Sequence, residues 1–418
     1  MYNKNSNQMK KEFLSLIICL LPISLFAEKI VVDGIFYNIY SGSFDAEVTE
    51  SPDKYSGDIV IPEMISYRGK QFKVTTIGED AFRLCDNLSS VVIPNSVVQI
   101  ERGAFCDCEN LKNVRFSSNL TRIKKEAFNG CKNLVEVNLP EKLSSIDVSA
   151  FAYCESLKSL VIPLNVLSIG VGAFKECSGL RSITVDKANK VYDSRNDCNA
   201  VIISSNNTLI IGCANTIIPK DIMVIGDLAF CGCKDLTNIS IPNSVTNISE
   251  GAFTWSGLTS VDIPNSVTRI GKYAFQSCKQ LLSVTIPESV TVIDEVAFSS
   301  CDTLQSLTFL GKDTYIGKWA FADCSQLRDV YIHSPYKLYF GEDAFENCYY
   351  HSVLHVQKDI LDDYKNDNNW KNSFDEIIAI GSENDYNFTF LILGALILLL
   401  FVFITYKKRK DNKTRQIK

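Results

Sequence analysis

The sequence predicts a repeat solenoid, mainly β-structure with short helical or 3-10 turns, followed by one transmembrane helix. The dipeptide Ala-Phe recurs every 22 to 24 residues from Phe82 to Phe345, with one interruption after Phe174. Apolar residues occupy fixed positions between successive markers, and an uncharged apolar stretch lies at 388–406. A period in the twenties means that each unit buries its apolar side only by stacking on its neighbours.

The bulk composition is that of a large globular protein. Of the 418 residues, 46% are hydrophobic and 22% are charged, which is enough apolar material for an extended core. The formal net charge of -6 provides no general attraction to nucleic acid. Binding to nucleic acid is therefore not predicted.

Residues 1–27 have the features of a secretory signal peptide. Lys10 and Lys11 precede an apolar run that ends at Ala27, and this run is too short to span a bilayer. Cleavage after Ala27 is predicted, followed by an N-terminal β cap at 28–58. Cys19 offers an alternative lipoprotein signal, although Ile18 stands where a small residue is expected before it.

Residues 59–348 form the predicted stack of about a dozen coils. In the first full unit, the segment EDAFRLC favours a tight helical or 3-10 turn, because Glu79 and Asp80 stand at its start. Strands in successive coils are expected to pair in a parallel sheet. Coils that are consecutive in the sequence are then neighbours in space.

The segment LSSVVIP of the same unit has the alternation of a short strand. Val91 and Ile93 are predicted to point into the core, while Ser90 and Val92 point out. Pro94 ends the strand because proline has no N–H to donate to a ladder. Equivalent outward positions in all coils therefore form one presented face.

A cysteine follows the marker phenylalanine by three residues in nearly every unit: Cys85, Cys108, Cys131, Cys154, Cys177, Cys233, Cys278, Cys301, Cys324 and Cys348. We interpret this column as reduced packing side chains at a turn where coils approach closely, since free cysteine is among the most buried residue types. Disulfides between successive coils are the alternative in an exported protein. Ser256 replaces the cysteine in one unit, which favours packing. The additional Cys106 and Cys231 are expected to be exposed.

An irregular insert at 186–218 interrupts the period. Within it, NAVIISSNNTLIIGC carries two apolar runs around Asn206 and Asn207, which indicates a hairpin. The insert is either a projecting knob or a longer coil that continues the stack. A turn of four residues would place Cys198 opposite Cys213, so a disulfide between them is one possible pairing.

The C-terminal part contains a cap, a linker, a membrane span and a tail. The apolar stretch begins at Phe388 and ends at Tyr406, and its length matches a hydrocarbon core of about 30 Å. The sequence KKRK follows it, which predicts a cytoplasmic tail and extracytoplasmic repeats. A buried core helix is the alternative interpretation. The predicted boundaries are 349–380 for the cap, 381–387 for the linker, 388–406 for the transmembrane helix and 407–418 for the basic tail.

The unit L-x-S-V-x-I-P-x-S-V-x-x-I-x-x-x-A-F-x-x-C, as in LTSVDIPNSVTRIGKYAFQSCKQL, resembles the BspA-type leucine-rich repeat. The flanking segments VVDGIFYNIYSG and DILDDYKNDNNWKNSFDEI resemble the caps of such proteins from Bacteroidetes-like bacteria. The resemblance implies a horseshoe or rod on the cell surface that binds other molecules, often as an adhesin. It implies no catalytic residues and no cofactor.

Catalytic chemistry is not predicted. Histidine occurs only at His333, His351 and His355, so candidates for general acid-base catalysis are few. Cys348, His351 and His355 have a spacing that suits zinc, but Cys348 belongs to the packing column and SVLHVQ has the pattern of a strand. We therefore assign no catalytic, cofactor-binding or metal-binding residue.

Binding is instead predicted on outward strand positions, where short polar side chains dominate. The candidate surface comprises Asn113, Arg115, Asn138, Thr184, Asn238, Asp262, Thr285, Thr308 and Tyr331. The last repeat also carries a concentration of aromatic residues: Tyr315, Trp319, Tyr331, Tyr336 and Tyr339.

Together these features predict a membrane-anchored extracytoplasmic protein that binds a protein or a glycan in adhesion or another cell-surface interaction. The alternative is a scaffold or sensor partner that faces the periplasm from the inner membrane. An enzymatic role is the third and least supported class, since no combination of nucleophile, base and orienting residue stands out.

Overall fold

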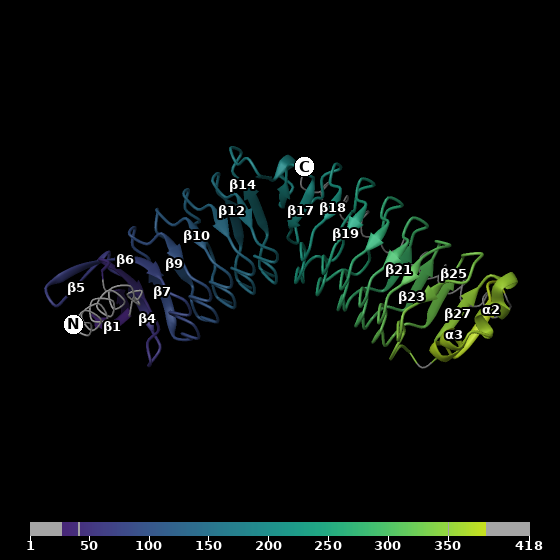
Figure 1. Ribbon diagram of the computed structural model, residues 1–418. Coiled ribbons are helices and arrows are strands. Elements are labelled where there is room, and N and C mark those ends of the chain that lie inside the picture. The colour runs from purple at the N-terminus through teal and green to yellow at the C-terminus, as the bar shows by residue number, and fades with distance from the viewer. Residues whose placement is uncertain (1–26, 41, 350, 382–418) are drawn as a thin grey trace, which may run out of the picture. The chain divides into compact units, whose positions relative to one another are not determined.

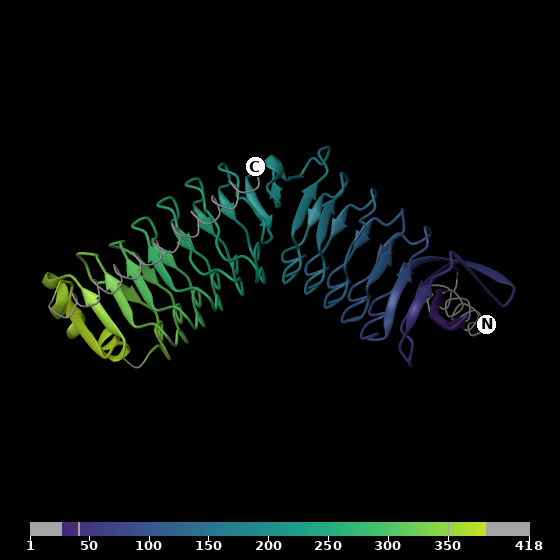
Figure 2. The same cartoon turned by 180° about the vertical axis from the view of Figure 1, so that it is seen from behind.

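The computed structural model describes residues 27–40, 42–349 and 351–381, which fall into two compact units. Unit 1 contains the described residues up to Ser205, and unit 2 contains those from Asn206 onward. The boundary lies inside the predicted insert. In each unit the coils lie side by side in chain order, as Figures 1 and 2 show from opposite sides.

Unit 1 begins with an antiparallel cap that leads into a ladder of two-residue strands, here called the short-strand sheet. Its order is β1 (Ala27–Val32), β2 (Ile35–Tyr40), β3 (Asp45–Val48), β6 (Lys70–Ile77), β8 (Gln99–Ile100), β10 (Arg122–Ile123), β11 (Ser145–Ile146) and β13 (Ser168–Ile169), with β5 (Met64–Tyr67) paired to β6. From β3 to β13 the strands of this order pair in parallel.

A second side of the unit 1 coils carries longer strands, here called the long-strand sheet. It contains β4 (Gly57–Val60), β7 (Leu88–Val92) and β9 (Asn113–Arg115), then β12 (Ser159–Ile162) and β14 (Ser182–Val185). In β7, Val91 is buried and its neighbours Ser90 and Val92 are partly exposed, which confirms the predicted alternation. The unit ends with β15 (Tyr192–Asp193), η1 (Arg195–Asp197) and β16 (Val201–Ile203).

Unit 2 repeats the two sheets. The short-strand sheet runs through β17 (Thr208–Ile211), β18 (Val224–Ile225), β19 (Asn247–Ile248), β20 (Arg269–Ile270), β22 (Val292–Ile293), β24 (Tyr315–Ile316) and β26 (Tyr339–Phe340). The long-strand sheet contains β21 (Ser283–Ile286), β23 (Ser306–Phe309), β25 (Asp329–Ile332), β27 (Val353–Val356) and β28 (Glu376–Ala379). The cap adds η2 (Lys358–Ile360), α2 (Leu361–Lys365) and α3 (Asn368–Ser373).

The insert continues the stack within unit 2. Strand β17 pairs in parallel with β18, with Thr208 opposite Val224, so it occupies the place of an ordinary short strand. The predicted turn is present at residues 204–207, and Asn207 there has φ of 53°. This arrangement favours the longer-coil interpretation over a projecting knob.

The third side of each coil contains the Ala-Phe marker, and here the predicted helical or 3-10 turn is wrong. Asp80 and Leu84 have φ of 53° and 57°, values in the left-handed region that a right-handed helix does not contain. Alternate N–H groups point to the next coil: Phe82 N donates to Ala104 O at 2.7 Å, and Leu84 N donates to Cys106 O at 2.9 Å. The N–H groups between them bond within the coil to the third residue before, as Arg83 N does to Asp80 O at 3.0 Å. Bonds between coils therefore alternate with turn bonds within a coil, and no continuous helix forms.

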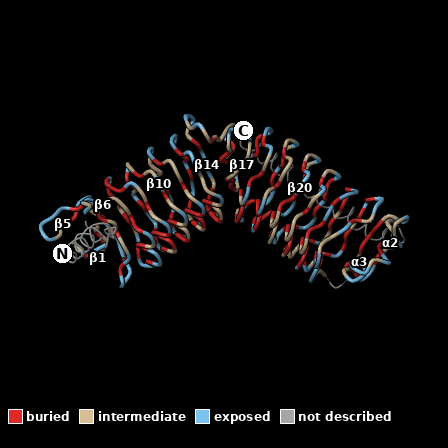
Figure 3. The backbone as a smooth tube through the Cα atoms, viewed as in Figure 1, coloured by how far each residue is buried: buried red, intermediate tan, exposed pale blue. Residues whose placement is uncertain are grey.

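The marker phenylalanines form a stacked column in the core of each unit. Phe105 and Phe128 lie 4.9 Å apart between ring centroids with an interplanar angle of 6°, and Phe275 and Phe298 repeat this geometry at 4.9 Å and 7°. These four rings are fully buried. Figure 3 shows how buried positions recur in every coil.

The cysteine column joins neighbouring coils through the same turns. Cys108 Sγ donates to Phe82 O at 2.9 Å, and Cys301 Sγ donates to Phe275 O at 3.2 Å. The same bond to the preceding marker carbonyl recurs for Cys131, Cys154, Cys177, Cys278, Cys324 and Cys348. At the replaced position, the Ser256 hydroxyl lies 3.3 Å from Cys278 Sγ. This geometry supports the interpretation of the column as packing thiols.

Separate side chains close the two ends of the described stack. In unit 1, the Tyr55 ring packs at 4.5 Å on Phe82, and its backbone N donates to Cys85 Sγ. In unit 2, Trp370 and Phe374 pack on Phe345, the last marker. Both caps therefore supply aromatic rings where no further coil stacks.

Four predicted segments lie outside the described residues. These are the signal peptide, apart from Ala27 with which β1 begins, the linker at 381–387, apart from Gly381, the transmembrane span at 388–406 and the basic tail at 407–418. Among the residues that the structure describes, no helix has the length and apolar character needed to cross a bilayer.

Burial of the cysteine column predicts that the fold is sensitive to alkali. Burial raises the pKa of Cys278 from 9.0 to about 12. Above pH 9.0 the unfolded chain loses this proton while the folded chain keeps it, so stability falls as pH rises toward about 12. We expect the urea midpoint to stay nearly constant up to about pH 8 and to fall progressively between about pH 9 and about pH 11.

The matched control is Cys278→Ala, which removes the thiol and should weaken the dependence on pH. Burial also raises the pKa of Tyr55 to about 12, so part of the dependence should remain. A midpoint that stays constant over this range would contradict the prediction.

Candidate binding surfaces

The outward side of the long-strand sheet in unit 1 carries four of the predicted binding residues. Asn113 and Arg115 lie on β9, Asn138 lies in the next coil, and Thr184 lies on β14; all four are exposed. They alternate with buried residues, as a strand with one solvated side requires. We call this surface the unit 1 face.

Apolar side chains share the unit 1 face with these polar residues. Arg115 is in register with Val92, and Thr184 is in register with Val161, whose side chain is 55% exposed. The face therefore offers short apolar patches beside hydrogen-bonding groups. Such mixed surfaces suit broad, multipoint contact more than a single tight anchor.

The equivalent unit 2 face brings four of the five remaining predicted residues into one column. Thr285 is in register with Thr308, and Thr308 is in register with Tyr331. Asp262 holds the same repeat position in the preceding coil, where its backbone forms an isolated parallel β-bridge with Ser240. Asn238 is exposed two residues before Ser240, in the neighbouring column of outward positions. Neighbouring strands are about 4.8 Å apart, so a ligand along this column meets a new side chain at each step.

The strand register of the unit 2 face continues into the last described coils, where the side chains beside Tyr331 are buried. Tyr331 stacks on His355 at 4.2 Å with an interplanar angle of 18°. His355 Nε2 lies 3.0 Å from Asp329 Oδ1, and both of these side chains are buried. His355 in the strand SVLHVQ is in register with Tyr331, so the repeat spacing predicts that the two rings are neighbours.

The proposed zinc spacing does not correspond to a cluster. Cys348 Sγ bonds to Phe321 O and His355 bonds to Asp329, so the two side chains have separate partners. His351 is exposed and its Nδ1 lies 4.0 Å from Asp375. Within the part of the chain that the structure describes, no three His, Cys, Asp or Glu residues are grouped as ligands for a metal ion.

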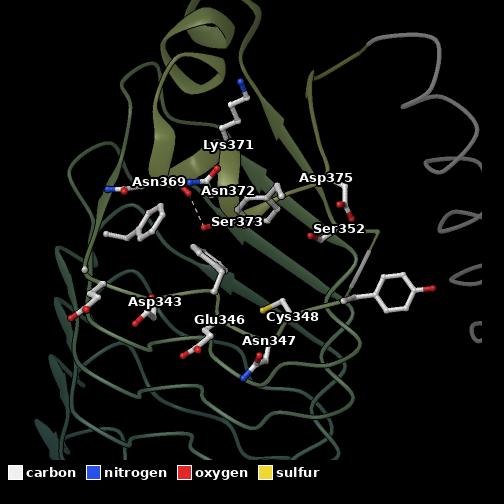
Figure 4. A pocket seen from close by; sticks show the side chains of 16 residues that line it. Asp343, Glu346, Asn347, Cys348, Ser352, Asn369, Lys371, Asn372, Ser373 and Asp375 are labelled. Atoms are coloured by element: carbon white, nitrogen blue, oxygen red, sulfur yellow. Dashed lines mark hydrogen bonds between the residues drawn. The ribbon is translucent and has the colours of Figure 1, made fainter.

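A hollow of about 780 Å³ lies between the last coil and the cap of unit 2. Figure 4 shows Asp343, Glu346 and Asn347 on the coil and Asn369 and Ser373 on α3 across from them. Ser373 Oγ donates to Asn369 O at 2.8 Å, which uses the hydroxyl within the helix.

Cys348 also lines this hollow, at the end of the cysteine column. Burial raises the pKa of its thiol well above the ordinary value, so the sulfur is held as a neutral thiol. A neutral thiol is a poor nucleophile, and Cys348 donates to Phe321 O at 3.3 Å. Cys348 is therefore not an activated nucleophile, and we describe the hollow as a polar recess.

Comparison with known proteins identifies the repeats. Residues 75–198, 211–328 and 246–362 match the model of the BspA type leucine rich repeat region. The chain belongs to this BspA type repeat family. No curated protein matches the chain.

Solved structures share the BspA type fold. A leucine-rich repeat protein from Bacteroides ovatus ATCC 8483 is 23% identical, with 83% of this chain and 88% of that chain covered and a TM-score of 0.51. The pneumococcal vaccine antigen PcpA is 19% identical, with coverage of 85% and 99% and a TM-score of 0.64. A leucine-rich repeat protein from Eubacterium ventriosum ATCC 27560 is 23% identical, covers 77% and 95%, and has a TM-score of 0.56. At these identities the similarity shows the fold alone.

Two additional cysteines of the BspA type repeats differ from expectation. Cys106 and Cys231 were expected to be exposed, but both are buried. Short side chains at this position stay below the surface formed by neighbouring turns, as Ala152 and Ala322 also do, whereas the longer Arg83 reaches solvent. Burial raises the pKa of Cys106 to about 12.

The disulfide between Cys198 and Cys213 stays a prediction. Both side chains are buried, Cys198 in unit 1 and Cys213 in unit 2. Within unit 2, the backbone N of Cys213 donates to Thr216 Oγ1 at 2.8 Å, which fixes the local turn around it.

Proposed function

We propose that the protein is an exported, single-pass membrane protein whose repeats bind a protein or glycan outside the cytoplasm, in adhesion or a related surface interaction. The proposed mechanism is binding without turnover, in which each coil of a face contributes a small increment. The observation that carries this proposal is the in-register column of Thr285, Thr308 and Tyr331 on the unit 2 face, with Asp262 at the same repeat position in the preceding coil.

The physical support for binding is the rigidity of this face. Thr308 and Tyr331 stand on strands that pair with a neighbouring strand on each side, Thr285 stands on the edge strand of the same sheet, and buried residues alternate with all three. Little conformational entropy is then lost when a ligand contacts several coils together. A polar column of this kind presents hydroxyl and carboxylate groups at a regular spacing.

Arginine substitutions at the centre of the unit 2 face test the proposal. Thr285→Arg and Thr308→Arg should each weaken ligand binding by roughly ten-fold or more, because a long charged side chain blocks contact along the column. The measurement is the signal of the full-length protein, solubilised in mild detergent, on glycan and protein arrays, followed by titration of each ligand found.

Thr291→Arg is the matched control, because Thr291 is exposed next to the short-strand sheet and away from the unit 2 face. It should leave binding unchanged. Equal loss of binding in the control and in the face variants would contradict the assignment of the face. Loss of the folded circular dichroism spectrum in any variant would remove that variant from the comparison.

Location is tested separately by protease treatment of intact cells. Digestion of the repeats on intact cells supports the surface-adhesin proposal. Protection until an outer envelope is opened supports the alternative, a scaffold or sensor partner that faces the periplasm. The uncharged stretch at 388–406 followed by KKRK motivates both arrangements.

A further inference from the structure

Two tyrosines stand side by side at the end of the unit 2 short-strand sheet. Tyr315 on β24 is in register with Tyr339 on β26, and their side chains are 50% and 69% exposed. The preceding coils carry Asn247, Arg269 and Val292 at this position. The aromatic pair is therefore a local feature of the last coils and not a requirement of the repeat.

A third tyrosine reaches the same place from the loop between β25 and β26. Tyr336 is 60% exposed, while Ser334 beneath it is fully buried. Ser334 Oγ donates to Tyr336 O at 2.8 Å and accepts from Tyr336 N at 3.0 Å. These two bonds fix the loop backbone that carries the exposed ring.

The cap holds the backbone between Tyr336 and Tyr339 from both sides. Leu338 N donates to Tyr364 Oη at 2.9 Å, and Trp370 Nε1 donates to Leu338 O at 3.2 Å. Lys337 Nζ lies 2.8 Å from Asp367 Oδ2 and 5.7 Å from the centre of the Tyr339 ring. The exposed rings are thus attached to a backbone that is ordered before any ligand binds.

These rings line a hollow of about 600 Å³. Lys312, Asp313 and Asp363 add charged groups of both signs around it. Lys337 also lines the hollow, and its ion pair with Asp367 neutralises its charge. The wall therefore combines exposed aromatic faces with nearly balanced donors and acceptors.

We propose that this hollow binds a neutral carbohydrate, with Tyr315, Tyr336 and Tyr339 as its aromatic platform. One side of a pyranose ring presents C–H groups, which pack on the electron-rich face of a tyrosine. Its hydroxyl groups accept from ammonium groups and donate to carboxylates, here Lys312, Asp313 and Asp363. Charges of both signs suit a neutral sugar better than an anion or a cation.

The two strands also place the rings at a spacing suited to sugars. Parallel neighbours lie about 4.8 Å apart, close to the width of one sugar ring. Tyr315 and Tyr339 point outward from one sheet, so they form a platform and not a cage around a cation. The hollow belongs to the short-strand sheet, so this site is independent of the unit 2 face on the long-strand sheet.

The test measures binding of a panel of neutral hexose and pentose oligosaccharides, including maltohexaose, cellohexaose and xylohexaose, to the detergent-solubilised full-length protein. We expect at least one to bind, and Tyr315→Ala and Tyr339→Ala each to weaken it by roughly ten-fold. Tyr339→Phe keeps the ring and should retain most of the affinity. Tyr273→Ala is the matched control, since Tyr273 also lies beneath a lysine, at 4.9 Å from Lys272 Nζ, but outside the hollow.

Absence of binding to every sugar in the panel would overturn the proposal. It would also fail if binding persisted unchanged in Tyr315→Ala and Tyr339→Ala, or if it were lost equally in Tyr273→Ala. Sugar binding that is lost in Thr285→Arg but not in the tyrosine variants would assign the sugar to the unit 2 face instead. Capture of a protein that depends on the three tyrosines, without sugar binding, would mark the hollow as a protein contact and overturn the carbohydrate assignment.

Discussion

Replacing Phe298 by alanine is expected to lower the free energy of unfolding by about 3–5 kcal/mol. Phe298 is fully buried and stacks between two other rings, at 4.9 Å from Phe275 and 5.1 Å from Phe321. Its removal leaves a cavity that the coils cannot close, because hydrogen bonds on three sides hold them at fixed spacing. Urea denaturation followed by circular dichroism measures the loss.

Phe44→Ala provides the control for this substitution. Phe44 is 70% exposed and lies 6.4 Å from Phe72, so its loss should change stability by less than about 1 kcal/mol. If the two variants lose the same stability, the phenylalanine column does not carry the core energy that its burial indicates.

Replacing Trp370 by alanine is the second substitution with a large expected effect, again about 3–5 kcal/mol. Trp370 is buried beneath the cap, where it packs on Phe340 at 4.5 Å and on Tyr364 at 5.0 Å. Its Nε1 also donates to Leu338 O. The variant should therefore expose the end of the stack and loosen the backbone that carries Tyr336 and Tyr339.

Trp255→Ala is a control of the same residue type. Trp255 is 44% exposed, and its backbone N donates to Gln276 O whatever side chain it carries. The comparison uses urea midpoints and the binding of any sugar that the hollow accepts. Trp370→Ala should lower both, whereas Trp255→Ala should lower neither by much. Full stability of Trp370→Ala would contradict the role of the cap.

Much of the repeat was predictable because its signals are local. The alternation of Ser90, Val91, Val92 and Ile93 follows from a strand with one buried side, and the structure confirms it. The register of Thr285 with Thr308 follows from a constant period, since equivalent residues of parallel neighbours meet. The outward side of the sheet could therefore be identified from spacing alone.

The marker turn was mispredicted because its sequence imitates a helix start. Glu79 and Asp80 are favourable near a helix N-terminus, but Asp80 has a positive φ and its N–H donates to Arg102 O in the next coil. Partners more than twenty residues away decide this conformation, so local propensity does not reveal it. The burial of Cys106 was missed for a related reason, since the neighbouring turns determine how far a short side chain lies below the surface.

The two hollows of unit 2 could not be predicted from the sequence. The aromatic residues near Tyr315 were visible as a concentration, but their arrangement depends on how Trp370 and Tyr364 hold the loop at Leu338. The contact of His355 with Asp329 likewise joins two strands 26 residues apart. Such sites depend on how a cap packs on a coil, and the repeat period does not determine this packing.

The hydrogen bonds between coils repeat from unit to unit, and the marker N–H bonds to the alanine before the next marker, as Phe105 N to Ala127 O and Phe128 N to Ala150 O do. An in-frame deletion or duplication of one complete unit therefore brings chemically equivalent groups together again. Recombination between neighbouring copies in the gene can lengthen or shorten the protein while the caps stay matched to their adjoining coils. The length of the polar faces is then a heritable property that changes by one repeat at a time.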